Sequence, residues 1–496
     1  MEGFRLNRLK DIYISRRALL LLGAQTALLV LQFAAFTKVG LATFEDACMK
    51  IFFFGAVNII LQITSLLMLG RLISLGGLFI PVTYLVNLSY VTLIAFHAQG
   101  PSSALTVLYL SRYGQYTFLK ASIYALNTVC FVFLGYLLFS IFTFTMQDTA
   151  SEDSATANIS LSQILSIGKP SSVLFGLIYF ISISYQLMFS FTHQSYVDLA
   201  SITRTPLLNT AINLQPFFFA GLYLLMVYYK LDDRMNISRR LLLFAIFSLV
   251  ISFFTGSRSR GMMMLLVLLI LWEKTIEKIS PRTFWACLLW GVVLLQLLYS
   301  IRSVRGHELT FENWAIAFFS MKDNIIYETL NEFGASICAT AGLMNVTMTA
   351  RPADFLIKEV GSILPNVSTW GGAAFQIPVD REGIEQLYHM GSTFVGDLYF
   401  YFGEAGQYLA MFIGAWIAGL DNFIESRRNA GRYWGIAIAI PGLYTVFNSS
   451  RASISLGLKM FLYSFVIFSI LKAIFRVRNG NKGLHGDERA YLGGAV

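Results

Sequence analysis

The stretch LLLFAIFSLVISFFTGSRSRGMMMLLVLLILW, residues 241–272, places two arginines at the tip of a hydrophobic hairpin. Apolar runs lie on both sides of its central GSRSRG segment, which carries Arg258 and Arg260. Charge at a membrane boundary is costly unless it meets water, an anion or a carboxylate. Arginine also presents a planar fork that matches phosphate oxygens. The segment therefore suggests a site for a phosphate-bearing lipid, and the alternative is that both arginines snorkel to lipid headgroups.

The composition of the whole chain is that of an integral membrane protein. Of 496 residues, 56% are hydrophobic and only 13% are charged, whereas soluble domains carry about 25% charge. Apolar runs of bilayer length recur along the chain, and they are solid rather than alternating, which favours helices over a β-barrel. Four scattered cysteines give neither a disulfide framework nor a metal-binding pair. We therefore predict an all-α, polytopic transmembrane helical bundle.

Basic residues next to the apolar runs predict the topology, because lysine and arginine accumulate on the cytoplasmic side. We expect about twelve spans with both chain ends in the cytoplasm. The net charge of +9 sits mainly in short loops next to spans, so it indicates orientation rather than nucleic-acid binding. The expected spans are 18–36, 51–69, 75–96, 121–144, 172–191, 217–229, 241–254, 262–272, 284–301, 394–420, 434–447 and 454–474.

One long loop interrupts this series of spans. Residues 302–392 mix polar residues, turn residues and short apolar pieces, and the most apolar piece, Ala335 to Met348, is too short to span a bilayer. By the same counting the loop is extracytoplasmic and packs on the membrane face as a small domain. The chain thus divides into residues 1–301 with spans one to nine, the loop domain 302–392, residues 393–475 with spans ten to twelve, and a cytoplasmic tail, 476–496.

Arginines assigned to the outer surface form the most informative set. The positive-inside rule disfavours arginine on the outer side of the membrane, so an arginine there suggests pairing with an anion or a carboxylate. A diphosphate suits such a set because each guanidinium can bind its oxygens bidentately. For any single arginine, a headgroup contact or an ion pair with a neighbouring carboxylate is the alternative. The set comprises Arg112, Arg204, Arg258, Arg260, Arg302, Arg305, Arg351, Arg381 and Arg451.

Candidate acids and bases lie in the loop and in the span that follows it. Asp397 and Glu404 fall within the apolar run 394–420 and, being seven residues apart, should share one helix face. Glu332 and His389 belong to the loop. A neutral imidazole can accept a proton near neutral pH, whereas a carboxylate needs a raised pKa, which nearby arginines oppose. His389 therefore ranks first as a general base and Glu332 second, with Asp397 as an arginine partner that orients the site.

No nucleotide-binding, zinc-protease or hydrolase motif occurs in the structural context that it requires. A reaction on the outer face must then use a substrate that is already activated. A lipid diphosphate meets this requirement.

Five segments, in order, resemble those of bacterial oligosaccharide repeat-unit polymerases, the Wzy-type O-antigen polymerases. The resemblance covers roughly the second half of the chain, and it departs from the family at Asp397, where glutamate is expected. The segments are Thr255–Gly261, Asn331–Ser336, Gly361–Asn366, Gly391–Gly406 and Asn448–Arg451.

The resemblance implies a GT-C-like glycosyltransferase in the bacterial inner membrane, with its active site on the periplasmic or outer face. Such an enzyme moves a growing glycan from undecaprenyl diphosphate onto another lipid-linked repeat unit, without a nucleotide, cofactor or required metal. Its partners are the lipid-linked oligosaccharide, membrane lipids and a chain-length regulator, and no nucleic acid. The diphosphate-binding candidates are Arg258, Arg260, Arg302, Arg305, Arg451 and Arg204, and the catalytic candidates are His389, Glu332 and Asp397.

Three other functions remain open at this stage. An O-antigen ligase would resemble the polymerases in fold but transfer glycan to the lipid A core. A flippase or transporter should place charges along a central path through many spans, and inverted repeats would favour it. A scaffold protein of the same assembly system is the third alternative.

Overall fold

A computed structural model describes residues 2–37, 43–98, 114–147, 161–192, 206–253, 258–280, 325–345, 352–356, 393–451 and 456–491, with a few single residues between them. Helices make up nearly all of these residues, and none of them is in a β-strand. The long helices are α1 (Glu2–Phe36), α2 (Phe44–Met68), α3 (Leu75–Ala95), α5 (Gln115–Gln147), α6 (Leu161–Thr192), α8 (Pro206–Leu231), α9 (Met235–Phe253), α10 (Arg258–Leu271), α18 (Gly406–Asn429), α19 (Tyr433–Asn448) and α20 (Leu458–Tyr491).

Seven of these helices are long and apolar enough to cross a membrane, which confirms a helical membrane protein. They correspond to the first seven predicted spans. The eighth predicted span is α10, 14 residues long and continued by a π-helical turn, η3 (Trp272–Ile276). The predicted ninth span, 284–301, lies almost entirely outside the described residues.

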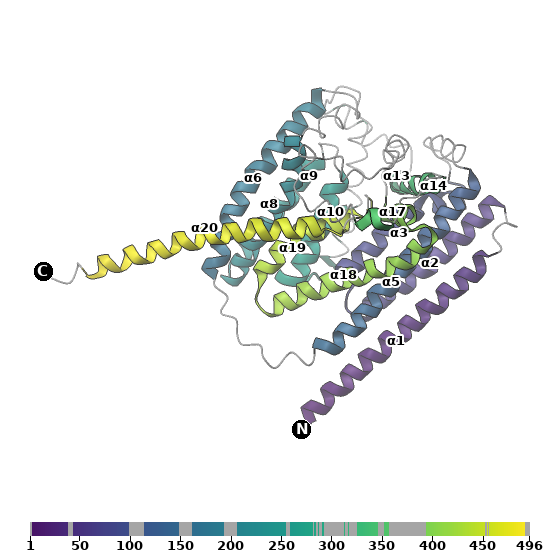
Figure 1. Cartoon of the computed structure of the whole chain (residues 1–496), viewed down its shortest axis with the longest axis horizontal. Coiled ribbons are helices and arrows are strands. Elements are labelled where there is room, and N and C mark those ends of the chain that lie inside the picture. The colour runs from purple at the N-terminus through teal and green to yellow at the C-terminus, as the bar shows by residue number, and fades with distance from the viewer. Residues whose placement is uncertain are drawn as a thin grey trace.

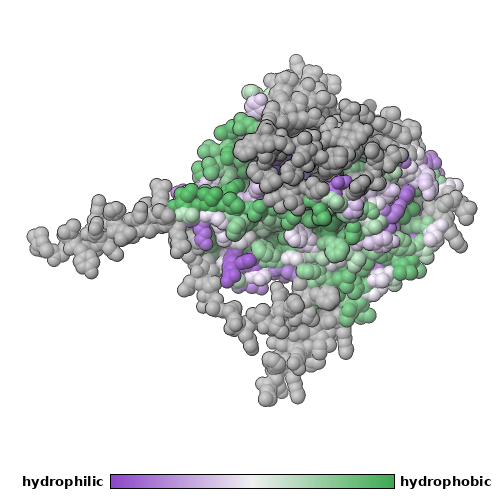
Figure 2. Space-filling view, viewed as in Figure 1, coloured by the Kyte–Doolittle hydropathy of each residue, from purple (hydrophilic) through white to green (hydrophobic). Residues whose placement is uncertain are grey.

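The helices form two packed groups (Figure 1). One group contains α1, α2, α3, α5 and α18, and the other contains α6, α8, α9, α10 and α19. Helix α20 crosses the second group at a wide angle. Large apolar side chains such as Leu177 and Ile181 on α6 and Phe465 on α20 are exposed, and hydrophobic surface covers both helices (Figure 2). Contiguous exposed apolar surface of this kind indicates contact with lipid.

Two glycines allow α5 and α18 to pack closely. A Cβ atom at Gly135 would lie 1.9 Å from the carbonyl oxygen of Met411, and one at Gly414 would lie 1.8 Å from that of Val132. Membrane helices lack a hydrophobic driving force between them, so close backbone contact at small residues contributes much of their association. The crossing of α5 and α18 therefore depends on both glycines.

Gly414→Ala is expected to lower the melting temperature of the detergent-solubilised protein, because α18 must move away from α5. Overpacking of this kind costs about 1–3 kcal/mol. Gly419→Ala is the matched control, since its Cβ would meet Phe139 at an ordinary 3.5 Å, and both variants gain the same helix propensity. Equal melting temperatures for the two variants would contradict the role of the close contact.

A chain of buried amides links four helices inside the first group. Gln25 of α1 donates to Asn58 of α2 (2.7 Å), and Asn58 donates to Gln32 of α1 (2.8 Å). Gln32 then donates to Asn127 of α5 (2.5 Å), which donates to Gln407 of α18 (3.1 Å). Side-chain hydrogen bonds of this type contribute to helix association in membranes. They fix α1, most of which faces away from the other helices, in its register.

The predicted tenth span is not one helix. A first helix, α17 (Phe394–Phe402), ends at Gly403, where φ is +57°, and a 3-10 turn, η5 (Gly403–Ala405), leads into α18. Positive φ is favourable for glycine and ends a helix. The expectation that Asp397 and Glu404 share one helix face is therefore wrong. Asp397 is fully buried, whereas Glu404 is exposed and pairs with Lys120 at 2.7 Å.

Part of the predicted loop packs within the bundle. Helices α13 (Ile325–Gly334) and α14 (Ser336–Asn345) contact α3, and α14 also packs on α5 and α17. A Cβ at Gly334 would lie 2.6 Å from the backbone nitrogen of Tyr90, and one at Gly396 would lie 3.1 Å from Thr340. The short apolar piece identified in the sequence is thus buried against other helices. The extracytoplasmic position of the loop and its independence as a domain stay predictions.

Candidate functional site

A small, partly open cavity lies among five helices of the second group, with a free volume of about 20 Å³, on the scale of ordered water. Helix α6 contributes Tyr179, Ile183 and Gln186 to the lining, and α8 contributes Ile212, Gln215, Pro216 and Phe219. The remaining lining residues are Leu249 and Ser252 of α9, Arg260, Gly261 and Met264 of α10, and Tyr444 of α19. The lining is mainly apolar, with a small number of polar groups and, among the lining residues described, a single charged one. That composition suits an amphiphilic ligand.

Arg260 is this charged residue, and it lies in the first turn of α10. Gly261 beside it allows α10 to approach α9, since a Cβ there would lie 2.4 Å from the Phe253 ring. Arg260 is half-buried, and it forms no hydrogen bond or ion pair with any residue that the structure describes. A partly buried cation in a membrane protein needs a counter-charge. An anionic ligand would supply it.

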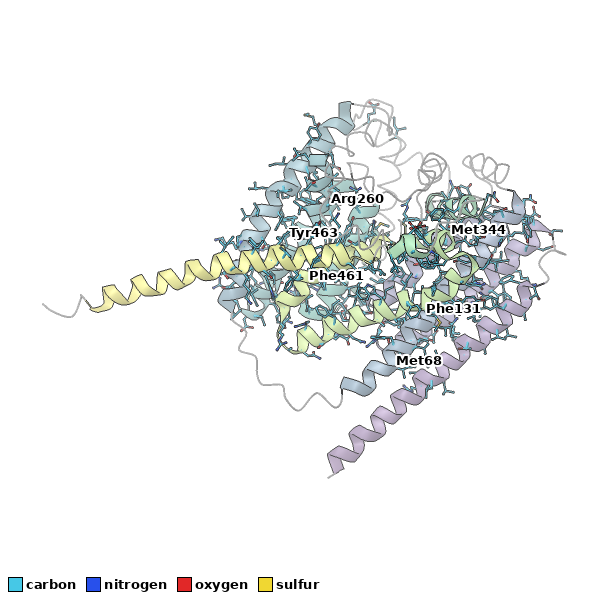
Figure 3. The ribbon with its side chains drawn as sticks, viewed as in Figure 1. Met68, Phe131, Arg260, Met344, Phe461 and Tyr463 are labelled. Carbon is cyan, nitrogen blue, oxygen red and sulfur yellow. The ribbon has the colours of Figure 1, made fainter. Side chains whose placement is uncertain are left out.

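The cavity lies toward the end of the bundle where α9 joins α10, which we call the hairpin end. Figure 3 shows Arg260 and Met344 of α14 toward this end, whereas Met68 of α2 lies toward the opposite end. Basic residues of the loops between predicted spans, including Arg234, Arg239 and Lys274, lie at the opposite end. The cavity therefore lies toward the end of the bundle that the sequence predicts to face outward.

Arg71, at the opposite end, shows what a buried arginine requires. It is only 4% exposed and donates to Ser140 Oγ (3.0 Å) and Asn422 Oδ1 (2.8 Å), with Glu425 at 3.8 Å. Burial opposes its charge, but Tyr136, Glu425 and the nearby Asp421 more than offset this effect and raise the pKa of Arg71. The chain supplies these partners for Arg71, whereas no described residue forms a hydrogen bond or an ion pair with Arg260.

Three segments singled out in the sequence meet near the hairpin end. The Arg451 guanidinium lies 4.8 Å from the Phe333 ring centre, a cation–π contact between the end of α19 and α13. The Asp397 carboxylate accepts a hydrogen bond from the Ile454 backbone N–H at 2.6 Å. Phe394 N–H donates to the carbonyl oxygen of Ser449 at 3.1 Å. Asp397 thus holds the backbone at Ile454, three residues after Arg451, and its expected role as an arginine partner stays a prediction.

The remaining predicted site residues are described only in part or lie outside the described residues. Arg258 begins α10 and Glu332 lies in α13, but neither side chain is described. His389, Arg204, Arg302 and Arg305 lie outside the described residues. The structure therefore places Arg260 at the cavity, Arg451 against Phe333, and the Asp397 carboxylate at the Ile454 backbone.

Five polar residues of the cavity were missed in the sequence: Tyr179, Gln186, Gln215, Ser252 and Tyr444. Gln186 lies inside the predicted fifth span, and Gln215 lies two residues before the predicted sixth. A polar residue within an apolar run is a signal that could have found them, since such residues face the bundle interior.

Among the residues that the structure describes, no group of three or more histidine, cysteine, aspartate or glutamate residues could hold a metal ion.

No family model, curated protein or solved structure matches this chain.

Proposed function

We propose that this protein is a glycosyltransferase that polymerises undecaprenyl-diphosphate-linked oligosaccharide repeat units into a surface polysaccharide. The observation that carries the proposal is Arg260, a half-buried cation without a partner among the described residues, at a largely apolar cavity. A polyprenyl diphosphate combines the two properties that this cavity matches, an anionic head and an apolar chain. Arginine suits its phosphate oxygens through bidentate hydrogen bonds.

The proposal includes the topology that the sequence predicts. The chain would have about twelve spans in a GT-C-like arrangement in the bacterial inner membrane. Both termini would be cytoplasmic, and the hairpin end would face the periplasm. Arg258, Arg302, Arg305, Arg451 and Arg204 would join Arg260 around the diphosphate.

In the proposed reaction, a hydroxyl of the acceptor repeat unit attacks the anomeric carbon of the donor glycan. The bond between that carbon and the diphosphate oxygen breaks, and undecaprenyl diphosphate leaves. Fixed guanidinium groups stabilise the charge that develops on the leaving group. The hydroxyl proton goes to a base, for which His389 and then Glu332 are the candidates. Asp397 holds the backbone at Ile454, three residues after Arg451.

Purified protein in liposomes, supplied with a synthetic undecaprenyl-diphosphate-linked repeat unit, tests the proposal. We expect products that contain two or more repeat units, together with released undecaprenyl diphosphate. Movement of the substrate across the bilayer without bond formation would instead identify a transporter. Transfer that occurs only when a lipid A core is added would identify a ligase.

A further inference from the structure

Helix α10 is too short to place a charge at both surfaces of a membrane. Arg260 lies in its first turn, and Lys274 lies in η3, 14 residues further along the chain. Fourteen helical residues rise about 21 Å, whereas the hydrocarbon core of a bilayer is about 30 Å thick. The end of α10 that the protein holds in place therefore decides how deep the other end lies.

Helix α18 holds Lys274 through both its side chain and its backbone. The Lys274 ammonium forms an ion pair with Glu425 of α18, and the residue is only 8% exposed. The carbonyl oxygen of Lys274 accepts a hydrogen bond from the Arg428 guanidinium at 2.8 Å. Glu425 also lies 3.8 Å from Arg71, so one carboxylate serves two buried cations. A lysine whose charge is paired inside the protein is not free to extend to the membrane surface.

The next residue of the π-helical turn is held from the other helix group. Lys230 of α8 donates a hydrogen bond to the Thr275 carbonyl oxygen at 2.7 Å. The last carbonyl groups of a helix lack donors within the helix, and basic side chains can satisfy them. Turns of π-helix are rare and frequently occur at functional sites. The opposite end of α10 is thus attached to α18 of the first group and α8 of the second.

The hairpin end of α10 differs from the opposite end in this respect. Arg260 forms no hydrogen bond or ion pair with any residue that the structure describes. Charge in the hydrocarbon region is unfavourable, and arginine side chains extend toward water where they can. Release of the Lys274 ion pair would therefore let α10 move toward the membrane surface at the hairpin end.

We propose that Lys274 is a positioning residue, which through its ion pair with Glu425 fixes the depth of α10 in the membrane and so the position of Arg260. The anchor keeps Arg260 below the membrane surface at the hairpin end, where fewer water molecules compete for the guanidinium. A fixed cation stabilises developing charge best where water is excluded. The inference rests on the proposed function where it concerns glycan transfer, but the anchor itself can be measured without a substrate.

The first experiment measures the depth of α10 in proteoliposomes of the full-length protein. Met262→Cys places a half-buried thiol in the second turn of α10, and a membrane-impermeant thiol reagent is supplied on both sides of the bilayer. Lys274→Met, which removes the charge and keeps most of the side-chain length, should raise the rate of modification about 10-fold, because a protected group reacts only in its open state. An unchanged rate would overturn the anchor.

Matched variants control this measurement. Glu425→Gln breaks the same ion pair from the other side, so it should reproduce the effect of Lys274→Met, and it serves in its place if that variant does not fold. Lys278→Met removes a lysine that is 75% exposed and pairs with Glu273 at 3.1 Å at the same end, and it should leave the rate unchanged. Protein without Met262→Cys gives the background from native thiols.

The second experiment measures glycan transfer and separates positioning from stability. Lys274→Met should slow single-turnover transfer about 10- to 100-fold, since a small misplacement of a catalytic group has an effect of this size. In the Arg260→Ala background the same change should have little further effect, because the anchor acts through Arg260. Effects that multiply would show that Lys274 only stabilises the bundle. If the wild type transfers no glycan but Met262→Cys still reports the movement, the proposed function fails and the anchor stands.

Discussion

Arg260→Ala is expected to reduce the rate of glycan transfer about 100- to 1,000-fold, the usual effect of removing one donor that stabilises developing negative charge. In the free protein the guanidinium forms no hydrogen bond or ion pair with a described residue, so in the proposed reaction its binding energy would be available for the leaving diphosphate. Single-turnover transfer by the purified variant, with the lipid-linked repeat unit at saturating concentration, measures this effect apart from changes in affinity.

Two further variants define what the Arg260 side chain contributes. Arg260→Lys keeps the charge but loses the bidentate fork, so its rate should lie between those of the wild type and the alanine variant. Arg239→Ala removes an exposed arginine that pairs with Glu277 at 2.6 Å at the opposite end, and it should leave transfer unchanged. Normal transfer by Arg260→Ala at wild-type abundance would reduce Arg260 to a lipid-headgroup anchor.

Asp421→Ala is expected to destabilise the folded protein by about 3–5 kcal/mol, the range found when one member of a buried charge network is removed. The carboxylate is 1% exposed and accepts hydrogen bonds from the backbone N–H groups of Leu75 (2.9 Å) and Gly76 (3.2 Å) at the start of α3. It also accepts one from the Tyr136 hydroxyl of α5 at 3.0 Å. Its loss leaves these donors unpaired and removes a counter-charge from Arg71.

Thermal unfolding in detergent, followed by the loss of monodisperse protein, measures this destabilisation. Asp421→Asn keeps one acceptor oxygen and should lower the melting temperature less than Asp421→Ala. Glu277→Ala disrupts an exposed ion pair at the same end, and such pairs contribute little, so its melting temperature should match that of the wild type. A wild-type melting temperature for Asp421→Ala would show that α3 is held by apolar packing alone.

The sequence predicted the helical membrane fold well because span formation is a local property. About twenty apolar residues suffice to cross a bilayer, and the lipid requires their backbone groups to pair within the helix. All seven helices that meet the length and hydropathy criteria correspond to predicted spans. The break at Gly403 was missed because α17 and α18 are both apolar, so the run looks continuous, whereas the end of a helix is decided by the backbone conformation of one residue.

The environment of each site residue, in contrast to span formation, is not a local property of the sequence. Sequence reasoning identified Arg260, Arg451 and Asp397, because charge next to or within apolar runs stands out. It could not distinguish Arg260 from Arg71, since that difference depends on partners such as Asn422, which is 351 residues from Arg71 in the chain. The sequence by itself determined which segments become membrane helices and where charge must be compensated. Only the tertiary structure decided which charges pair with other described residues, as Arg71 does, because contacts between distant helices form only when the bundle packs.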